Sequence, residues 1–174
     1  MNSRQVREHS QLQNIIEGFF VSEICTPSEE IWIVSPWISN FNVIDNRQGQ
    51  FSSLVPTWTP RYIKLSEVLY TICSNNTRIN ISTRSFEKES SNREIITYLQ
   101  NLLTNEEFKN LIYLKIDESL HEKGLLNDAM YLAGSMNLTM SGVSINKEVV
   151  EVKISDEFVN DGILEFKKYF EETW

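Results

Sequence analysis

The chain has few of the residues that build disulfide frameworks or metal sites, with two cysteines and two histidines in 174 residues. Disulfide scaffolds and zinc sites need more such residues at closer spacing. Cys25 and Cys73 are therefore expected to be reduced, buried thiols. The sequence predicts no bound metal and no cofactor.

Glycine, proline and positive charge are also scarce. Six glycines and four prolines form no linker or repeat, so residues 1–174 are expected to form one domain. A net charge of −8 argues against a broadly basic surface for nucleic acid. No apolar run approaches the roughly 18 residues of a membrane span, and the polar start lacks the core of a signal peptide. We expect a cytoplasmic protein that does not enter a membrane.

The pattern of apolar residues predicts alternating helices and strands. Helical periodicity marks residues 4–22, 64–74 and 93–108, and a last helix that Asp156 caps. Short apolar or alternating runs predict strands at 31–38, 78–84, 111–116 and 149–154. This order predicts an α/β fold, a mixed sheet with helices on both faces.

Residues 38–62 lack such periodicity and are expected to form a long loop. Its aromatic and basic side chains are Phe41, Phe51, Trp58, Tyr62, Arg47 and Arg61. The loop could line the rim of a site and contact substrate by stacking and phosphate binding. Its aromatic side chains could equally anchor it to the core. The sequence leaves both interpretations open.

The side chains best suited to catalysis and phosphate binding lie between positions 121 and 137. In extended chain, His121 and Lys123 share one face, and so do Ser135 and Asn137. A neutral imidazole is a nucleophile near its ordinary pKa of about 6.5, and the lysine, hydroxyl and amide groups can bind phosphate oxygens. Gly134 permits a close approach of backbone or ligand. The cluster indicates phosphodiester chemistry without a metal.

The wider spacing resembles a known family signature. His-x-Lys, an aspartate five residues after the lysine, and Gly-Ser-x-Asn resemble the HKD motif of the phospholipase D superfamily, here at 121–137. The gap between Asp128 and Gly134 is one residue shorter than the commonest form. Asn146-Lys147-Glu148 resembles the downstream Asn-x-Glu of superfamily nucleases, whose glutamate supports the catalytic histidine.

The resemblance implies a role for each matched residue. His121, Lys123 and Glu148 are expected to be catalytic, with Glu148 hydrogen-bonded to the Nδ1 atom of His121. Ser135 and Asn137 are expected to bind substrate. Two further positions are expected to give structural support, Gly134 and Asp128, the latter by holding the turn and Lys123.

The superfamily mechanism uses two such motifs, one histidine forming a phosphohistidine and the other protonating the leaving oxygen. This chain has one motif, and His9 lies in a polar helical segment that is expected to be exposed. The resemblance therefore implies a homodimer whose two His121 side chains face each other.

Small single-motif members resemble nucleases, so DNA is the expected substrate, within a bacterial modification, restriction or defence system whose other proteins are potential partners. Residues 32–46, WIVSPWISNFNVIDN, are similar to the phospholipase-D-like component of bacterial deazaguanine DNA-modification clusters. Two alternatives are a non-catalytic or partner-activated DNA-recognition subunit and a phosphatidyltransferase acting on phospholipids. Several arginines could form a local positive slot in this acidic chain: Arg47, Arg61, Arg78, Arg84 and Arg93.

Overall fold

A computed structural model of the chain describes residues 3–85, 90–154 and 156–171, apart from a few helical side chains, that of His9 among them. The strands are β1 (Ser3–Val6), β2 (Glu30–Val34), β3 (Asn42–Asp45), β4 (Tyr62–Lys64), β5 (Arg78–Thr83), β6 (Ile112–Ile116), β7 (Gly124–Leu126), β8 (Tyr131–Gly134) and β9 (Val150–Lys153). The helices are α1 (His9–Cys25), α2 (Leu65–Ser74), α3 (Ser90–Leu103), α4 (Met140–Ser144) and α5 (Asp156–Glu171).

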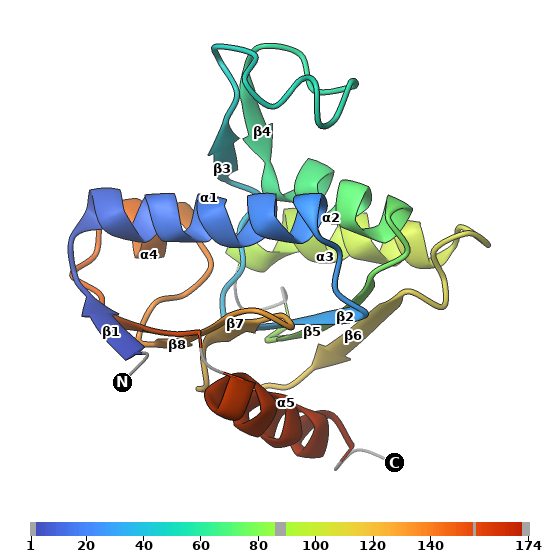
Figure 1. Cartoon of the computed structure of the whole chain (residues 1–174). Helices are drawn as coiled ribbons and strands as arrows, with labels where there is room; N and C mark the ends of the chain where they lie inside the picture. The colour runs from blue at the N-terminus through green and yellow to red at the C-terminus, as the bar shows by residue number, and fades with distance from the viewer. Residues whose placement is uncertain (1–2, 86–89, 155, 172–174) are drawn as a thin grey trace.

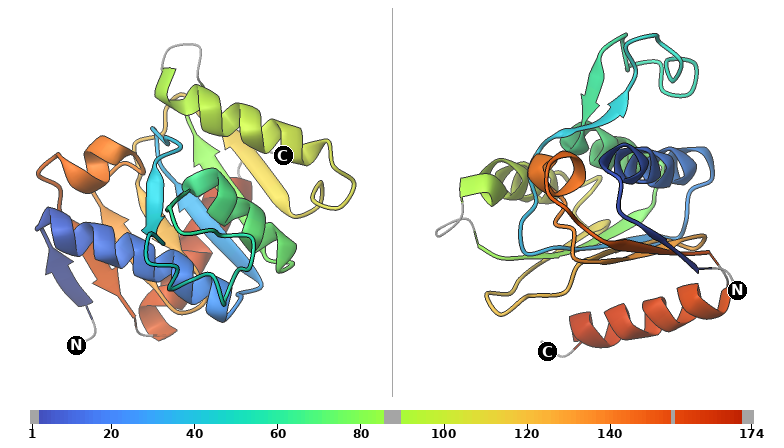
Figure 2. Two further views of the ribbon diagram at one scale, coloured as in Figure 1. Left: turned by 90° about the horizontal axis from the view of Figure 1, so that it is seen from above. Right: turned by 90° about the vertical axis from the view of Figure 1, so that its left-hand side faces the viewer.

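Seven strands form one mixed sheet in the order β1-β9-β8-β7-β2-β5-β6. Strands β2, β5 and β6 are parallel, whereas β7, β8, β9 and β1 each run antiparallel to their neighbours. Helices α1 to α4 cover one face and α5 covers the other (Figures 1 and 2). The expected α/β fold with helices on both faces is confirmed.

Strand β2 lies at the centre and is buried on both faces. Because side chains alternate along a strand, Ile31 and Ile33 pack under α1 and α2, whereas Trp32 and Val34 face α5. The four side chains are 0–2% exposed. This burial on both sides explains the short, continuous apolar run in the sequence.

The N-terminal segment differs from the expectation. Residues 4–22 were expected to form one helix, but Ser3–Val6 form β1, which pairs antiparallel with β9, and α1 starts at His9. Pairing with a strand nearly 150 residues away, from Ser3 to Lys153, overrides the local helical pattern. In α5, Phe166 and Phe170 are buried, whereas Phe158 is 36% exposed.

The segment 38–62 contains a hairpin. Strands β3 and β4 form a separate two-stranded sheet that projects beyond α1 and α2 (Figures 1 and 2). Phe41 and Trp58 are buried, and Phe51 packs against the same core. These three side chains therefore act as anchors.

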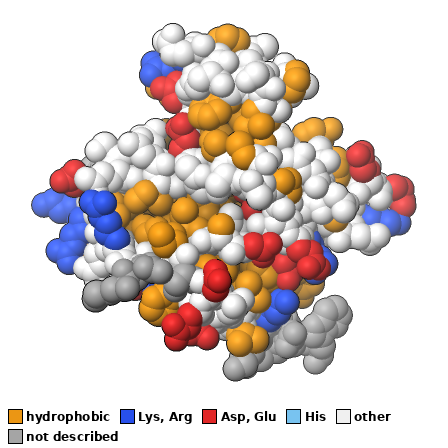
Figure 3. Space-filling view, in the orientation of Figure 1, with side chains coloured by type: hydrophobic (Ala, Val, Ile, Leu, Met, Phe, Trp, Pro, Cys, Tyr) orange, Lys and Arg blue, Asp and Glu red, His pale blue; other side chains and the backbone are white. Residues whose placement is uncertain are grey.

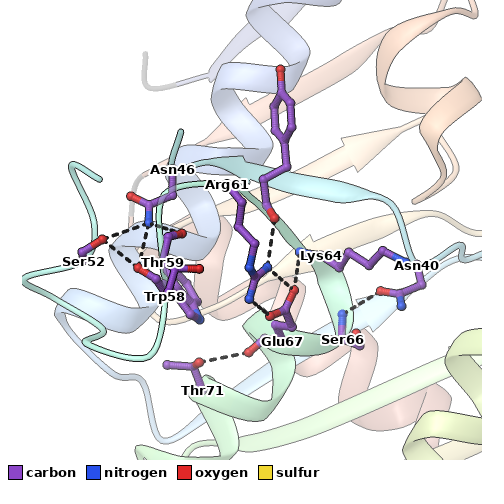
Figure 4. A network of polar contacts seen from close by, with 11 residues as sticks. Asn40, Asn46, Ser52, Trp58, Thr59, Arg61, Lys64, Ser66, Glu67 and Thr71 are labelled. Carbon is purple, nitrogen blue, oxygen red and sulfur yellow. Dashed lines mark hydrogen bonds and ion pairs between the residues drawn. The ribbon is translucent and has the colours of Figure 1, made fainter. Parts of the chain in front are cut away.

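The loop between β3 and β4 is closed by one buried amide. The Nδ2 atom of Asn46 donates to the carbonyl oxygens of Trp58 and Thr59 at 3.1 and 3.2 Å, and to Ser52 at 3.2 Å (Figure 4). Its Oδ1 atom accepts from the backbone N–H of Phe51 at 2.8 Å. The loop is held by its own polar contacts.

Candidate active site

The register of the sheet brings the motif residues to one edge. Val34 at the end of β2 lies beside Gly124 at the start of β7, which lies beside Ala133 near the end of β8. Gly134 in turn lies beside Val150 at the start of β9. Residues just before β7 and β9 and just after β2 and β8 therefore meet at this edge.

His121 and Lys123 lie in the segment that enters β7, rather than within a strand. The Nζ atom of Lys123 donates to the carbonyl oxygen of His121 at 2.7 Å, which holds the ammonium beside the histidine. His121 is exposed, and Lys123 is half-buried. Leu120, immediately before the histidine, is 1% exposed and anchors the segment in the core beneath α5.

Ser135 and Glu148 meet directly. The Ser135 hydroxyl donates to the Oε2 atom of Glu148 at 2.5 Å and accepts from the backbone N–H of Val149 at 3.1 Å. The backbone N–H of Ser135 donates to the carbonyl oxygen of Val149 at 3.0 Å. Glu148 was expected to contact Nδ1 of His121, but within the chain it is bonded to Ser135 and to Asn146.

Gly134 explains how these segments come so close. A Cβ atom at this position would lie 2.0 Å from the carbonyl oxygen of Val149. Any side chain here would push Ser135 away from Val149. Gly134 was expected to permit a close approach of backbone or ligand. In the structure, the backbone that approaches it is that of Val149, just before β9.

Asn137 follows on the same segment, which is bound to the loop after β2. The hydroxyl of Ser35 accepts from the backbone N–H of Leu138 at 3.0 Å and donates to the carbonyl of Trp37 at 2.8 Å. The Oδ1 atom of Asn137 is buried and has no hydrogen-bond partner in the described part of the chain. The segment that carries Asn137 is thus fixed at the site edge, and the side-chain oxygen of Asn137 is left without a partner there.

Asp128 is far from this edge. It lies beyond the other end of β7, where its Oδ2 atom accepts from the backbone N–H of Glu29 at 3.3 Å and its own N–H donates to the hydroxyl of Ser28. These contacts join the β7–β8 turn to the segment before β2, and among the described residues no hydrogen bond or ion pair links Asp128 to Lys123. The strand β7 separates the two residues.

The buried residue at this turn is Asn127, which is 2% exposed. Its Oδ1 atom accepts from the N–H groups of Ala129 and Met130, and its Nδ2 atom donates to the buried Glu23 at 3.1 Å. The position one residue before Asp128 therefore has the structural role that the motif suggested. The gap to Gly134, one residue shorter than usual, was the signal for this shift.

Arg84 is a site residue without a motif of its own. Its Nη2 atom lies 3.3 Å from the Nδ1 atom of His121, and its Nε and Nη2 atoms donate to the carbonyl oxygen of Leu120 at 3.0 and 2.8 Å. Arg84 follows β5 directly, and the end of β5 pairs with the end of β6, four residues before Leu120. The parallel register brings residues 84 and 121 together.

The other arginines suggested by the sequence are mostly neutralised. Arg47, Arg61 and Arg78 form ion pairs with Asp45, Glu67 and Glu30, respectively. Over the described ranges, neither Arg84 nor Lys123 has a carboxylate within ion-pairing distance. Two unpaired cations therefore flank His121 in a chain with a net charge of −8.

The site is shallow. The cavity beneath Lys123, Gly134 and Met136 holds only about 10 Å³. A groove of about 600 Å³ lies elsewhere, between α1 and the edge strands β1 and β9, where Figure 3 shows a hollow with hydrophobic side chains. The candidate active site is the shallow edge, because His121 lies there together with Arg84 and Lys123.

Two further expectations concern the remaining histidine and the cysteines. The side chain of His9 is outside those described, so its expected exposure stays a prediction. Both cysteines are free; Cys73 is buried as expected, but Cys25 is exposed at the end of α1.

In the part of the chain that is described, no three His, Cys, Asp or Glu side chains are grouped to hold a metal ion. Among the described helices, none has the length and apolar character needed to cross a membrane.

Comparison with known proteins identifies the family. Residues 21–174 match the family described as cardiolipin synthase, PLD-like domain. The chain belongs to the PLD-like family. Among curated proteins, none matches the sequence.

Solved structures of PLD-like proteins share the fold. NucT from Helicobacter pylori is 13% identical with a TM-score of 0.61, over 97% of this chain and 95% of that one. Nuc from Salmonella typhimurium, a phospholipase D family member, is 14% identical with a TM-score of 0.56, over 88% and 86%. Phosphatidylserine synthase from Haemophilus influenzae is 13% identical with a TM-score of 0.62, over 98% and 38%. The fold is that of PLD-family phosphodiesterases.

Proposed function

We propose that the chain is a metal-independent phosphodiesterase that cleaves DNA through a phosphohistidine on His121. The observation that carries this proposal is the meeting of His121 and Lys123 with Ser135 and Asn137 at one sheet edge of a PLD-like fold. An attacked phosphodiester gains negative charge, so it needs fixed cations and N–H donors at its oxygens. Lys123 and the Asn137 amide supply them here.

The active site is proposed to be shared by two chains. One histidine must attack phosphorus while another protonates the leaving oxygen, and each chain brings one HKD motif. A C2 homodimer places two copies of the same edge face to face. The shallow, open form of that edge fits half of a site. Sedimentation showing an active monomer at the assay concentration would refute this arrangement.

DNA is the proposed substrate for two reasons. The unpaired Arg84 and Lys123 give the edge a local positive charge that suits a polyanion, although the whole chain is acidic. The chain also spans nearly the full length of NucT and Nuc, whereas it spans 38% of the phosphatidylserine synthase. The compact, nuclease-like form of the fold supports a nuclease of a bacterial DNA-modification, restriction or defence system.

A narrower assignment rests on residues 32–46. This segment forms most of β2, the loop with Trp37, and β3. On its likeness we propose that the chain is DpdK, the PLD-like component of deazaguanine DNA-modification clusters, acting with other proteins of that system. This assignment is tested by comparing the rates at which the chain cleaves DNA with and without deazaguanine bases. Equal rates on the two substrates would count against recognition of the modified base.

A phosphatidyltransferase is the second candidate. The matched family is described as cardiolipin synthase, and one similar structure is a phosphatidylserine synthase. Turnover of phospholipid without cleavage of DNA would favour it.

The decisive experiment compares wild type with His121→Ala in the presence of EDTA. Bis-p-nitrophenyl phosphate, single-stranded DNA and duplex DNA serve as substrates. We expect wild-type activity in EDTA and a loss of at least about 10³-fold in the variant, the scale on which a nucleophile contributes. Activity that requires added metal, or that survives the substitution, contradicts the mechanism. No cleavage of any diester by the wild type would indicate a non-catalytic or partner-activated DNA-recognition subunit.

A further inference from the structure

Arg84 is held at the site edge by contacts along its whole length. Asn92, which is 0% exposed, donates from Nδ2 to the carbonyl oxygen of Arg84 at 2.8 Å. The Cζ atom of Arg84 lies 5.5 Å from the centre of the Trp37 ring. Its Nε and Nη2 atoms both donate to the carbonyl oxygen of Leu120, at 3.0 and 2.8 Å. The positive charge is therefore fixed in place beside His121.

The end of this guanidinium is only half used. Because Nε and Nη2 converge on Leu120, the fork formed by Nη1 and Nη2 points away from that carbonyl. In this fork Nη2 lies 3.3 Å from Nδ1 of His121. Nη1 has no partner in the described part of the chain and is not among its buried unpartnered atoms, so it faces solvent. Such a fork can bind two oxygens of one phosphate.

The contact between Arg84 and Nδ1 is not compatible with nucleophilic attack. A guanidinium can only donate, so the neutral ring beside it carries its proton on Nε2. Nδ1 is then covered and Nε2 has no lone pair, so neither nitrogen can attack phosphorus. For attack by Nε2, the proton must lie on Nδ1, and the donor there must give way to an acceptor. Phosphate oxygens are acceptors, and a guanidinium binds an anion more strongly than a neutral imidazole.

We propose that the Nη1–Nη2 fork of Arg84 binds a second phosphate of the substrate, the neighbour of the scissile one on the same strand. This inference rests on the proposed phosphodiesterase function. The scissile phosphorus belongs at Nε2, across the ring from Nδ1, so the phosphate in the fork is a different one. Its oxygens draw the fork away from Nδ1 and present acceptors to that nitrogen. The proton then stays on Nδ1, and Nε2 is left with the lone pair.

The proposal narrows the substrate class. A nucleic acid strand carries phosphates in succession, whereas a lipid with a single diester has nothing to place in the fork. Arg84 would therefore select polynucleotides, and the second phosphate would also bring the nucleophile into its reactive tautomer.

Four chromogenic diesters separate the second phosphate from the first. Thymidine 5′-p-nitrophenyl phosphate is compared with its 3′-phosphorylated form, and thymidine 3′-p-nitrophenyl phosphate with its 5′-phosphorylated form, which covers both directions along a strand. Wild type, Arg84→Met and Arg78→Met are assayed on each. Arg78 is the matched control, because it starts the strand that Arg84 follows and its partner Glu30 also pairs with Lys167. Thermal unfolding confirms that each variant is folded.

We expect the second phosphate to raise kcat/KM of the wild type by about 10–100-fold in one of the two directions, the scale of a hydrogen bond to a charged group. Arg84→Met should lose this advantage. Its rate on the diesters without a second phosphate should not fall, because nothing then covers Nδ1. Arg78→Met should keep the full advantage.

Binding of thymidine 3′,5′-bisphosphate tests the site without turnover. Calorimetry should show that the wild type binds it at least about 10-fold more tightly than either thymidine monophosphate, and that Arg84→Met does not. The histidine ¹⁵N spectrum reports the tautomer, and it is simple because the chain has two histidines. The proton of His121 should lie on Nε2 without ligand and on Nδ1 with the bisphosphate, while the His9 signals stay.

Three results would overturn the proposal. The first is equal wild-type rates on diesters with and without a second phosphate, in both directions. The second is an advantage that Arg84→Met retains, and the third is a proton that stays on Nε2 in the complex. If the wild type cleaves no diester but Arg84 still gives the bisphosphate its extra affinity, the proposed function fails and the phosphate site stands.

Discussion

Two glycines allow backbone segments of the site to touch where any side chain would separate them. A Cβ atom on Gly134 would lie 2.0 Å from the carbonyl oxygen of Val149, and one on Gly142 would lie 2.2 Å from that of Asn137. Real Cβ atoms do not approach backbone so closely, so a side chain at either position would have to move a site residue. The placement of Ser135 and Asn137 depends on these two residues.

Replacing Gly134 by alanine should therefore damage both stability and site geometry. We expect the free energy of unfolding to fall by roughly 1–3 kcal/mol, the usual cost of overpacking. Diester cleavage should fall as well, because Ser135 moves with Gly134. Gly18→Ala is the control: its Cβ meets nothing within 4 Å, and a helical alanine should add about 0.5–1 kcal/mol. Urea denaturation of both variants measures this, and equal stabilities would contradict it.

The two cysteines should differ in reactivity. The thiolate is the reacting species, and burial raises the pKa of Cys73 to about 12. Cys73 therefore stays protonated and unreactive at pH 8 in the folded chain, whereas the exposed Cys25 is accessible. Titration with a disulfide reagent should modify one thiol in the native protein and both in urea. Rapid modification of both in the native state would contradict the buried position of Cys73.

At the level of elements, the sequence predicted what depends on local periodicity. Helix α2 and strand β5 were predicted close to their observed bounds because their apolar patterns are strong, whereas the strand predicted at 31–38 ends at Val34, two residues before Pro36. Strand β1 was missed because its pairing with β9 is decided by a remote partner. The motif residues could be predicted for the site because their spacing is itself a signal.

Arg84 could not be singled out from the sequence among the five candidate arginines, because its position, like that of β1, depends on a remote strand pairing. Its closeness to His121 depends on the parallel pairing of β5 with β6, which no local pattern reveals. The contact of Glu148 with Ser135 likewise depends on the pairing of β8 with β9.

The start of α2 gives a pH-dependent test at this scale. Glu67 accepts from both terminal nitrogens of Arg61 and from the backbone N–H of Lys64 (Figure 4). The hydrogen bonds from Arg61 are the main reason that the pKa of Glu67 lies below its usual value. Because the pKa of Glu67 is lower in the folded chain than in the unfolded chain, the ionised carboxylate stabilises the fold at pH values above the unfolded pKa of about 4.3. This stabilisation is lost as the pH falls through the pKa of the folded chain.

Glu67→Gln should therefore destabilise the chain at pH 7 and matter less in acid. Because the pair is partly exposed, we expect a loss of about 0.5–1 kcal/mol at pH 7. The difference from wild type should shrink as Glu67 of the wild type becomes protonated. Glu106→Gln, which removes an exposed ion pair with Lys109 within one turn, is the control and should change little. Urea denaturation at pH 7 and pH 3 measures both, and a gap that widens in acid would contradict the sign.

On the scale of the whole molecule, charge and site geometry point to assembly. The net charge of −8 opposes unspecific binding of DNA to the chain as a whole, while Lys123 and Arg84, at the edge where His121 lies, form no ion pair with a carboxylate of the described residues. A second copy of that edge would double these cations around one diester and supply the second imidazole. The proposed homodimer would account for both the open form of this edge and its local charge.

Mixing subunits tests whether the site is shared. Wild type and His121→Ala are unfolded together in equal amounts and refolded, so that pairs form at random. If each cleavage needs two His121 side chains, about a quarter of the dimers are active and the activity per wild-type chain falls to about half. Mixing wild type with Arg78→Lys in the same way should leave the activity per chain unchanged, because that substitution lies at the far end of β5. If the mixture with His121→Ala keeps the activity per wild-type chain of refolded wild type alone, each chain works alone and the shared site is wrong.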